Sequence, residues 1–144
     1  LLLDIGPKED GTIPPEQITI LKELGAWNKK NGEAVFNTVA GMAPGHFYGP
    51  TTLSKDSTTL YLFLPSKTNG EVVIKGLYNA IREISVVGTA TKLTHKIVGK
   101  ISWSPVPGLV YINVPETVQD KYVTVLAVKL DGPVRLYKGK GGFD

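Results

Sequence analysis

The sequence contains no cysteine, and this absence excludes disulfide bonds, cysteine-ligated zinc and thiol nucleophiles. No apolar run approaches the ~20 residues that a transmembrane helix needs, so we expect no membrane partner. Neither a P-loop nor a Gly-x-Ser-x-Gly nucleophile motif is present. The glycine-rich stretch at 139–142 follows a predicted strand and precedes no helix, so we interpret it as a tail. We therefore expect no cofactor.

The sequence also lacks a large excess of either charge, because 16 Lys and Arg residues nearly balance 13 Asp and Glu residues, for a net charge of +3. The basic residues are scattered, so we expect no nucleic-acid surface. The 144 residues have the size of one domain, and 42% hydrophobic with 20% charged residues is typical of a globular protein. With 16 Gly and 10 Pro, the composition favours a fold with many turns over a helical bundle.

Residues 1–37 predict one strand, one loop and one helix. Leu1–Ile5 suits a strand buried on both faces of a parallel sheet, and a polar turn follows at 6–11. A helical pattern then runs from about Pro15 to Lys30, before the stop signal Asn31-Gly32. One arc of this helix carries Ile20, Leu21, Leu24 and Trp27. Such a unit cannot bury both faces of its own strand. We therefore expect it to end a larger α/β domain, and the opening without Met to mark a piece of a longer protein.

Residues 38–144 are rich in Val, Ile and Thr, which favour strands. About eight short segments are separated by turn signals, and this spacing predicts a mainly-β fold, an antiparallel β-sandwich with Greek-key or jelly-roll-like connections. The segment 38–50 is punctuated by Gly and Pro and is expected to be a linker, which leaves 51–144 as the sandwich domain. The expected strands are Thr59–Leu64, Glu71–Leu77, Arg82–Val87, Leu93–Val98, Lys100–Ser104, Leu109–Val114, Lys121–Leu130 and Val134–Lys138.

Asp4 is the acid of most interest, because it lies at the carboxyl end of the predicted buried strand. That edge carries the active site in barrels and in open α/β sheets. The alternative is that Asp4 only hydrogen-bonds the loop that follows. Glu9 and Asp10 could pass for the paired carboxylates of a glycosidase, but adjacent acids on a turn are more often solvated or capping groups.

His46 and His95 are the only histidines, and two such separated residues do not predict a metal site. His46 could instead pack, with Phe47 and Tyr48, on the rim of a neighbouring cleft. A second group of candidates is aromatic, because flat rings stack on sugars, although a sandwich also buries several aromatic side chains. These candidates are Tyr78, Trp103, Tyr111 and Tyr122.

The opening motif Leu-Leu-Leu-Asp-Ile-Gly-Pro-Lys-Glu-Asp-Gly-Thr-Ile-Pro at 1–14 resembles a signature near the end of the catalytic barrel of retaining α-L-fucosidases. The residues that follow, Pro-Glu-Gln at 15–17, Leu-Lys-Glu-Leu-Gly at 21–25, Trp27 and Asn-Gly-Glu-Ala-Val-Phe at 31–36, continue the match. The sequence departs from the signature at two places. Asp4 stands where Asn is common, and Asn37 stands where Gly is common.

The resemblance implies a (β/α)₈ barrel followed by a carboxyl-terminal β-sandwich, and cleavage of terminal α-L-fucose from glycans with retention. Family members use an Asp nucleophile and, in most, a Glu acid/base, both upstream of the signature. A barrel needs ~250 residues, so no catalytic residue can be assigned within this chain. The resemblance places Asp4 at the rim of the active site, as a candidate substrate-binding residue, and makes the upstream barrel and, through it, a fucosylated glycan the expected partners.

Two alternatives to this function stay open from the sequence: a carbohydrate-binding sandwich without catalysis, and a purely structural sandwich. The absence of cysteine fits a bacterial protein but does not separate cytoplasm from periplasm. The resemblance favours export, to the periplasm or outside the cell, because fucosylated glycans lie outside the cytoplasm.

Overall fold

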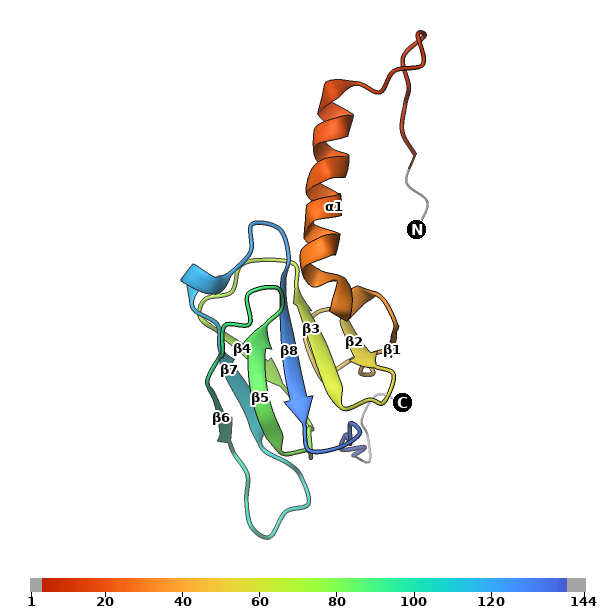
Figure 1. The fold of residues 1–144 in the computed structure, drawn as a ribbon. Helices are drawn as coiled ribbons and strands as arrows, with labels where there is room; N and C mark the ends of the chain where they lie inside the picture. Colours follow the sequence, from red (N-terminus) through yellow and green to blue (C-terminus); the bar gives the residue numbers. More distant parts are fainter. Residues whose placement is uncertain (1–3, 140–144) are drawn as a thin grey trace.

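The computed structural model describes residues 4–139, which form one long helix and two small sheets (Figure 1). No helix in this part of the chain combines the length and apolarity that crossing a membrane requires. The elements are α1 (Pro15–Val35), β1 (Thr38–Ala40), β2 (Thr51–Ser54), β3 (Thr59–Leu64), β4 (Glu71–Ile74), β5 (Ile81–Val86), β6 (His95–Val98), β7 (Leu109–Asn113), the short 3₁₀ helix η1 (Glu116–Val118) and β8 (Thr124–Leu130).

The two sheets are antiparallel throughout and pack face to face. The larger sheet has the strand order β1-β2-β3-β8-β5, and the smaller one has the order β4-β7-β6. Alternate residues of the strands point into the shared core, as in Leu60 and Leu62 of β3 and Ile112 of β7, which are fully buried. The predicted mainly-β antiparallel sandwich is therefore confirmed.

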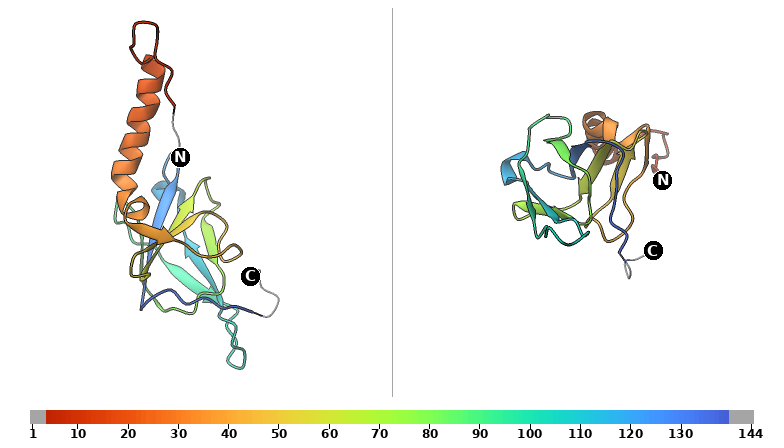
Figure 2. Two further views of the ribbon diagram at one scale, coloured as in Figure 1. Left: turned by 90° about the vertical axis from the view of Figure 1, so that its right-hand side faces the viewer. Right: turned by 90° about the horizontal axis from the view of Figure 1, so that it is seen from below.

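Helix α1 packs on the outer face of the larger sheet with its carboxyl-terminal half only. Ala34 is fully buried there with Tyr61 of β3 and Ala127 of β8, and Trp27 packs against the same cluster. The amino-terminal half projects past the end of the sheet (Figures 1 and 2). One side of the sandwich therefore shares its apolar contacts with a helix that extends beyond it.

The predicted end of this helix at Asn31-Gly32 is wrong. The helix continues to Val35, and Asn31 lies buried within it, with its side-chain amide donating to the carbonyl of Trp27 (3.0 Å). The left-handed residue that ends the helical path is Asn37, with φ of 59°. Asn tolerates this conformation better than most residues, which explains how it can stand where the resembled signature has Gly.

Two strand predictions also need correction. Residues 100–104 form a turn-rich loop, and the segment 134–138 contributes only a bridge between Leu136 and Leu77. Neither segment forms an extended ladder of hydrogen bonds with a strand of the described residues. Conversely, β2 at Thr51–Ser54 was not expected, and residues 38–50, expected as a linker, begin with β1 and place Met42 and Phe47 against the core. Pairing in the larger sheet thus starts before residue 51.

The predicted strand at 1–5 lies partly outside the described residues, since 1–3 are not described. Asp4 and Ile5 form no strand and are exposed. A strand needs a neighbour for its backbone groups, and the described residues provide none at this place.

Candidate functional site

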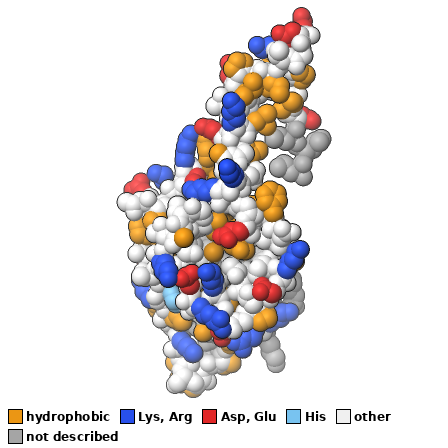
Figure 3. Space-filling view, in the orientation of Figure 1, with side chains coloured by type: hydrophobic (Ala, Val, Ile, Leu, Met, Phe, Trp, Pro, Cys, Tyr) orange, Lys and Arg blue, Asp and Glu red, His pale blue; other side chains and the backbone are white. Residues whose placement is uncertain are grey.

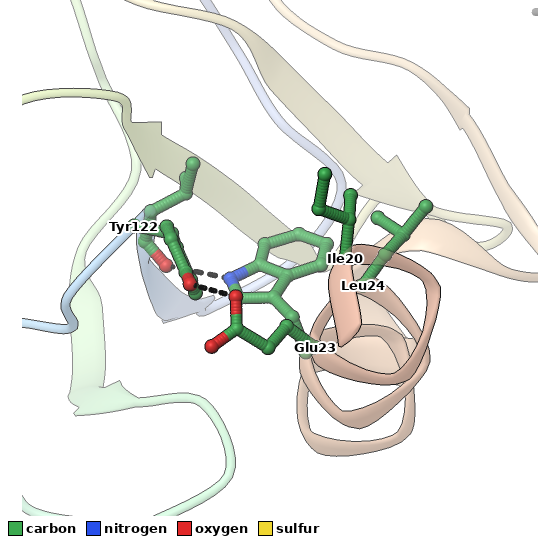
Figure 4. Close-up of a pocket in the computed structure, with 6 residues that line it drawn as sticks. Ile20, Glu23, Leu24 and Tyr122 are labelled. Atoms are coloured by element: carbon green, nitrogen blue, oxygen red, sulfur yellow. Dashed lines mark hydrogen bonds between the residues drawn. The ribbon is translucent and has the colours of Figure 1, made fainter. Parts of the chain in front are cut away.

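An apolar hollow lies where α1 leaves the sandwich (Figure 4). We call it the helix groove, and its volume is about 410 Å³. Its lining residues come from α1 and from the segment before β8: Ile20, Glu23, Leu24, Trp27, Tyr122 and Val123. Two of them are unusually open for aliphatic side chains, with Ile20 63% and Leu24 39% exposed. In the space-filling view, hydrophobic side chains gather over the projecting part of α1 (Figure 3).

One wall of the groove is fixed by hydrogen bonds between α1 and the segment before β8. The indole Nε1 of Trp27 donates to the carbonyl of Val123 (2.9 Å), and the hydroxyl of Tyr122 donates to the carboxylate of Glu23 (Figure 4). That hydrogen bond, together with the charge of Lys121, holds the pKa of Glu23 below its ordinary value. The carboxylate therefore stays ionised and keeps the two walls joined at neutral pH.

The chemistry of the groove is that of a contact surface. It presents aliphatic carbon over a floor of indole and valine, and its one carboxylate is engaged by Tyr122. The sequence pattern placed Ile20, Leu24 and Trp27 on one arc, and the structure confirms the arc. The pattern could not show that only Trp27 reaches the sheet, because the length of the sheet is a tertiary property.

The loop that carries the candidate acids is ordered by its own hydrogen bonds. Gly11 donates to the carbonyl of Lys8 (2.9 Å), and Gly6 donates to the side chain of Gln17 on α1 (3.0 Å). Asp10 accepts from the hydroxyl of Thr12 (2.6 Å) and from its backbone N–H (2.9 Å). These bonds lower the pKa of Asp10, with the hydroxyl as the larger cause. Asp10 therefore acts as a turn cap.

Asp4 and Glu9 are exposed, and no hydrogen bond joins either side chain to another described residue. The expected bond from Asp4 to its following loop is not seen, because Asp10 and Gln17 order that loop instead. The position of Asp4 at the rim of an active site stays a prediction.

The two histidines lie in different parts of the fold and have different surroundings. His46 is half-buried, and its Nδ1 lies 2.9 Å from the carbonyl of Lys75, to which it donates. The backbone N–H of Lys75 donates back to the carbonyl of His46 (2.8 Å), so His46 ties the segment before β2 to the end of β4. His95 is exposed on the edge strand β6. Among residues 4–139, no cluster of potential metal ligands forms.

Three of the four aromatic candidates are engaged within the fold. Lys96 lies 5.4 Å from the ring centre of Tyr111, and Lys121 lies 4.7 Å from that of Tyr122. The hydroxyl of Tyr78 donates to the carbonyl of Pro105 (2.8 Å). Trp103, at the tip of the β6–β7 loop, is the exception and is 81% exposed. The four do not form a common platform for a sugar.

Comparisons with known proteins give a consistent picture. The family model described as alpha-L-fucosidase matches residues 1–33. Plasma alpha-L-fucosidases of Pongo abelii and Homo sapiens are 32% identical to the chain over 78 residues, which is 51% of this chain and 17% of theirs. The chain therefore spans about a sixth of the length of these relatives.

Solved structures extend the likeness to most of the fold. The alpha-fucosidase of Thermotoga maritima superposes with a TM-score of 0.63 at 26% identity, over 88% of this chain and 30% of that one. Alpha-L-fucosidase isoenzyme 1 of Paenibacillus thiaminolyticus gives a TM-score of 0.73 at 24% identity, over 90% and 30% of the two chains.

These relatives are glycoside hydrolases, and the chain shares its sandwich with them. Within that class, both the opening motif and the fold are similar to those of α-L-fucosidases, and this confirms the resemblance predicted from the sequence.

Proposed function

We propose that this chain is the carboxyl-terminal segment of a retaining α-L-fucosidase that removes terminal α-L-fucose from glycans, and that the segment supports catalysis without performing it. The observation that carries the proposal is the continuity of α1. The family match over 1–33 runs into this helix, and the carboxyl-terminal half of the same helix is built into the sandwich. One rigid element thereby joins a barrel-type sequence to a β-sandwich.

The helix groove supplies the surface for this role. Ile20 and Leu24 are exposed on the half of α1 that projects beyond the sheet. Burying such a side chain from full exposure is worth about 1.5–3 kcal/mol, and Ile20 and Leu24 would gain the share that matches their exposed fractions of 63% and 39%. A catalytic barrel that packs on this half of α1 would gain that energy and would be braced against the sandwich.

Retention is proposed from the resemblance, and one relative supports it. A solved alpha-L-fucosidase of Bacteroides thetaiotaomicron, 18% identical to this chain, is described as a trapped covalent intermediate with 2-fluoro-fucosyl fluoride. A covalent glycosyl-enzyme is the hallmark of retention: a carboxylate displaces the protonated leaving oxygen, and water then displaces the carboxylate. We place both catalytic carboxyl groups upstream of Leu1, with Asp4 at the rim of the site.

The first experiment measures activity. The purified 144-residue chain is expected not to hydrolyse an aryl α-L-fucoside, whereas the longer protein that contains it should release fucose with retained anomeric configuration, as followed by NMR. Turnover by the 144-residue chain would overturn the supporting role. Inversion by the longer protein would overturn the assignment as a retaining enzyme.

The second experiment compares one substitution in two contexts. Leu24→Glu should destabilise the 144-residue chain only modestly, because Leu24 is already 39% exposed there. In the longer protein the same change should lower the Tm by several degrees, since a charge would enter a packed interface. Lys22→Glu, at a neighbouring exposed position of α1, is the control and should be neutral in both. Equal effects of Leu24→Glu in both contexts would contradict the docking of a barrel here.

A further inference from the structure

A second hollow lies on the outer face of the larger sheet, beside the carboxyl-terminal half of α1, and its volume is about 860 Å³. We call it the outer trough. Its floor is made of two rows of paired residues that cross β3, β8 and β5. The first row is Tyr61, Ala127 and Ser85, and the second is Thr59, Lys129 and Glu83. Tyr61 and Ala127 are only 8% and 5% exposed, because α1 packs beside them, so the second row is the more open part of the floor.

Two elements wall the trough. On one side stands α1 with Lys29, Lys30 and Glu33, and on the other stands the turn after β5. Gly88 in that turn touches the helix so closely that a Cβ atom would lie 2.3 Å from Cγ of Lys30 and 3.0 Å from its carbonyl oxygen. Helix and turn therefore meet directly at this point.

Several polar groups face the trough without an internal partner. Within residues 4–139, the hydroxyls of Thr59, Tyr61 and Ser85 form no hydrogen bond, and no side-chain polar atom is fully buried without one, so each hydroxyl reaches the molecular surface, that of Tyr61 from a side chain only 8% exposed. Glu83 accepts from Lys92 (2.8 Å) and from Lys129 (3.0 Å), and these bonds lower its pKa, the bond from Lys92 foremost. The trough thus offers fixed donors and acceptors around a small apolar floor.

This mixture of groups selects the ligand. The lining holds four lysines and two carboxylates, but Lys92 and Lys129 are paired with Glu83, and Lys30 with Asp120. Most of the positive charge is therefore already engaged, and an anion would gain little attraction. A purely apolar ligand would leave the hydroxyls unpaired. A neutral sugar carries hydroxyl groups on most of its carbons and also presents C–H faces to small apolar surfaces, and a volume of this size holds a short oligosaccharide.

We propose that the outer trough is a non-catalytic binding site for a short neutral oligosaccharide. The choice of a fucosylated probe rests on the proposed function, but the trough itself does not. Leu24 in the helix groove and Glu33 in the outer trough lie nine residues apart, which places them on opposite sides of α1. A barrel docked on the groove would therefore leave the trough open.

The test is a titration of the 144-residue chain with fucosyllactose, followed by NMR chemical shifts. We expect shifts at Tyr61 and Ser85 and saturation below about 10 mM. The double variant Tyr61→Phe and Ser85→Ala removes only two hydroxyl groups, and it should weaken binding by about three- to tenfold per hydroxyl lost. Its far-UV circular dichroism should match that of the parent chain.

Two controls keep the outcome decisive. Trp103→Ala should leave binding unchanged, because Trp103 lies in the β6–β7 loop and does not line the trough. A sulfated saccharide of the same length should bind no more tightly than fucosyllactose. Loss of binding in Trp103→Ala, preference for the sulfated probe, or no saturation would each overturn the proposal. Because the titration requires no catalysis, failure here leaves the proposed function intact, and inactivity of the longer protein would leave the trough intact.

Discussion

Trp27 joins α1 to the sandwich through both a hydrogen bond and packing, and its replacement by Phe tests that role. The change removes the hydrogen bond from Nε1 to the carbonyl of Val123 and shortens the ring that packs beside Ala34 and Val125. Loss of the hydrogen bond costs about 0.5–1.5 kcal/mol. The smaller ring costs about 1 kcal/mol more, because Trp27 is only partly buried. We therefore expect a loss of about 2 kcal/mol in the free energy of unfolding.

The assay is urea denaturation of the 144-residue chain followed by far-UV circular dichroism. With a slope of 1–3 kcal/mol per molar, typical of small proteins, the midpoint should fall by roughly 1 M. The matched control is Trp103→Phe, the same substitution at a side chain that is 81% exposed, and it should change stability by less than about 0.5 kcal/mol. Equal midpoints for Trp27→Phe and the parent chain, or a larger loss in Trp103→Phe, would refute the view that α1 is stabilised by this contact.

Two further changes test the turn before β2 and the ion pair at α1. Gly41→Ala should lower the free energy of unfolding by about 1–3 kcal/mol, because its Cβ would lie 2.1 Å from Oγ1 of Thr51. The control Gly132→Ala has no atom within 4 Å of its Cβ and should be nearly neutral in the same thermal melt. Burial opposes ionisation of Asp120, but hydrogen bonds from Lys30 (2.6 Å) and from backbone amides hold its pKa below the ordinary value. The stabilisation is therefore present above the unfolded pKa of about 3.9 and is lost as the pH falls through the lower folded value. Asp120→Asn should thus cost at most about 1 kcal/mol at pH 7, and its stability should converge with that of the parent in strong acid; a difference that persists there would exclude this cause.

The predictable part of the fold is the part in which sequence period and burial agree. β3 alternates Leu60, Leu62 and Leu64 with larger aromatics, and its predicted range is the observed one. The ends of other strands moved by one to three residues, because strand ends depend on the partner. The loop at 100–104 contains alternating Ile101 and Trp103, yet both are exposed. Alternation alone could not reveal that no partner strand reaches this loop.

The candidate site shows the same division. The arc of α1 could be predicted, but which of its residues are covered depends on where the sheet ends. The outer trough was not anticipated, because its floor requires the register that places Ala127 between Tyr61 and Ser85. Nothing in the sequence indicates that residues 61, 85 and 127 are neighbours, because only the pairing of distant strands brings them together. A local signal did exist for the opening motif, whose similarity to α-L-fucosidases spans contiguous residues.

The sequence pattern changes at residue 37, where we expect a domain boundary. The side-chain contacts of the fold nevertheless cross this boundary. Ala34 is buried against the outer face of the larger sheet, and its carbonyl accepts from the hydroxyl of Thr52 on β2 (2.7 Å). Removing residues 1–37 would expose the apolar row of β8 that Val125 and Ala127 form, because α1 covers it. We therefore expect residues 38–144 alone to melt at a lower temperature than the 144-residue chain and to bind a hydrophobic dye. If the shorter chain melts at the same temperature without binding the dye, α1 contacts the sandwich without stabilising it. The proposed bracing of a barrel through this helix would then lose its physical basis.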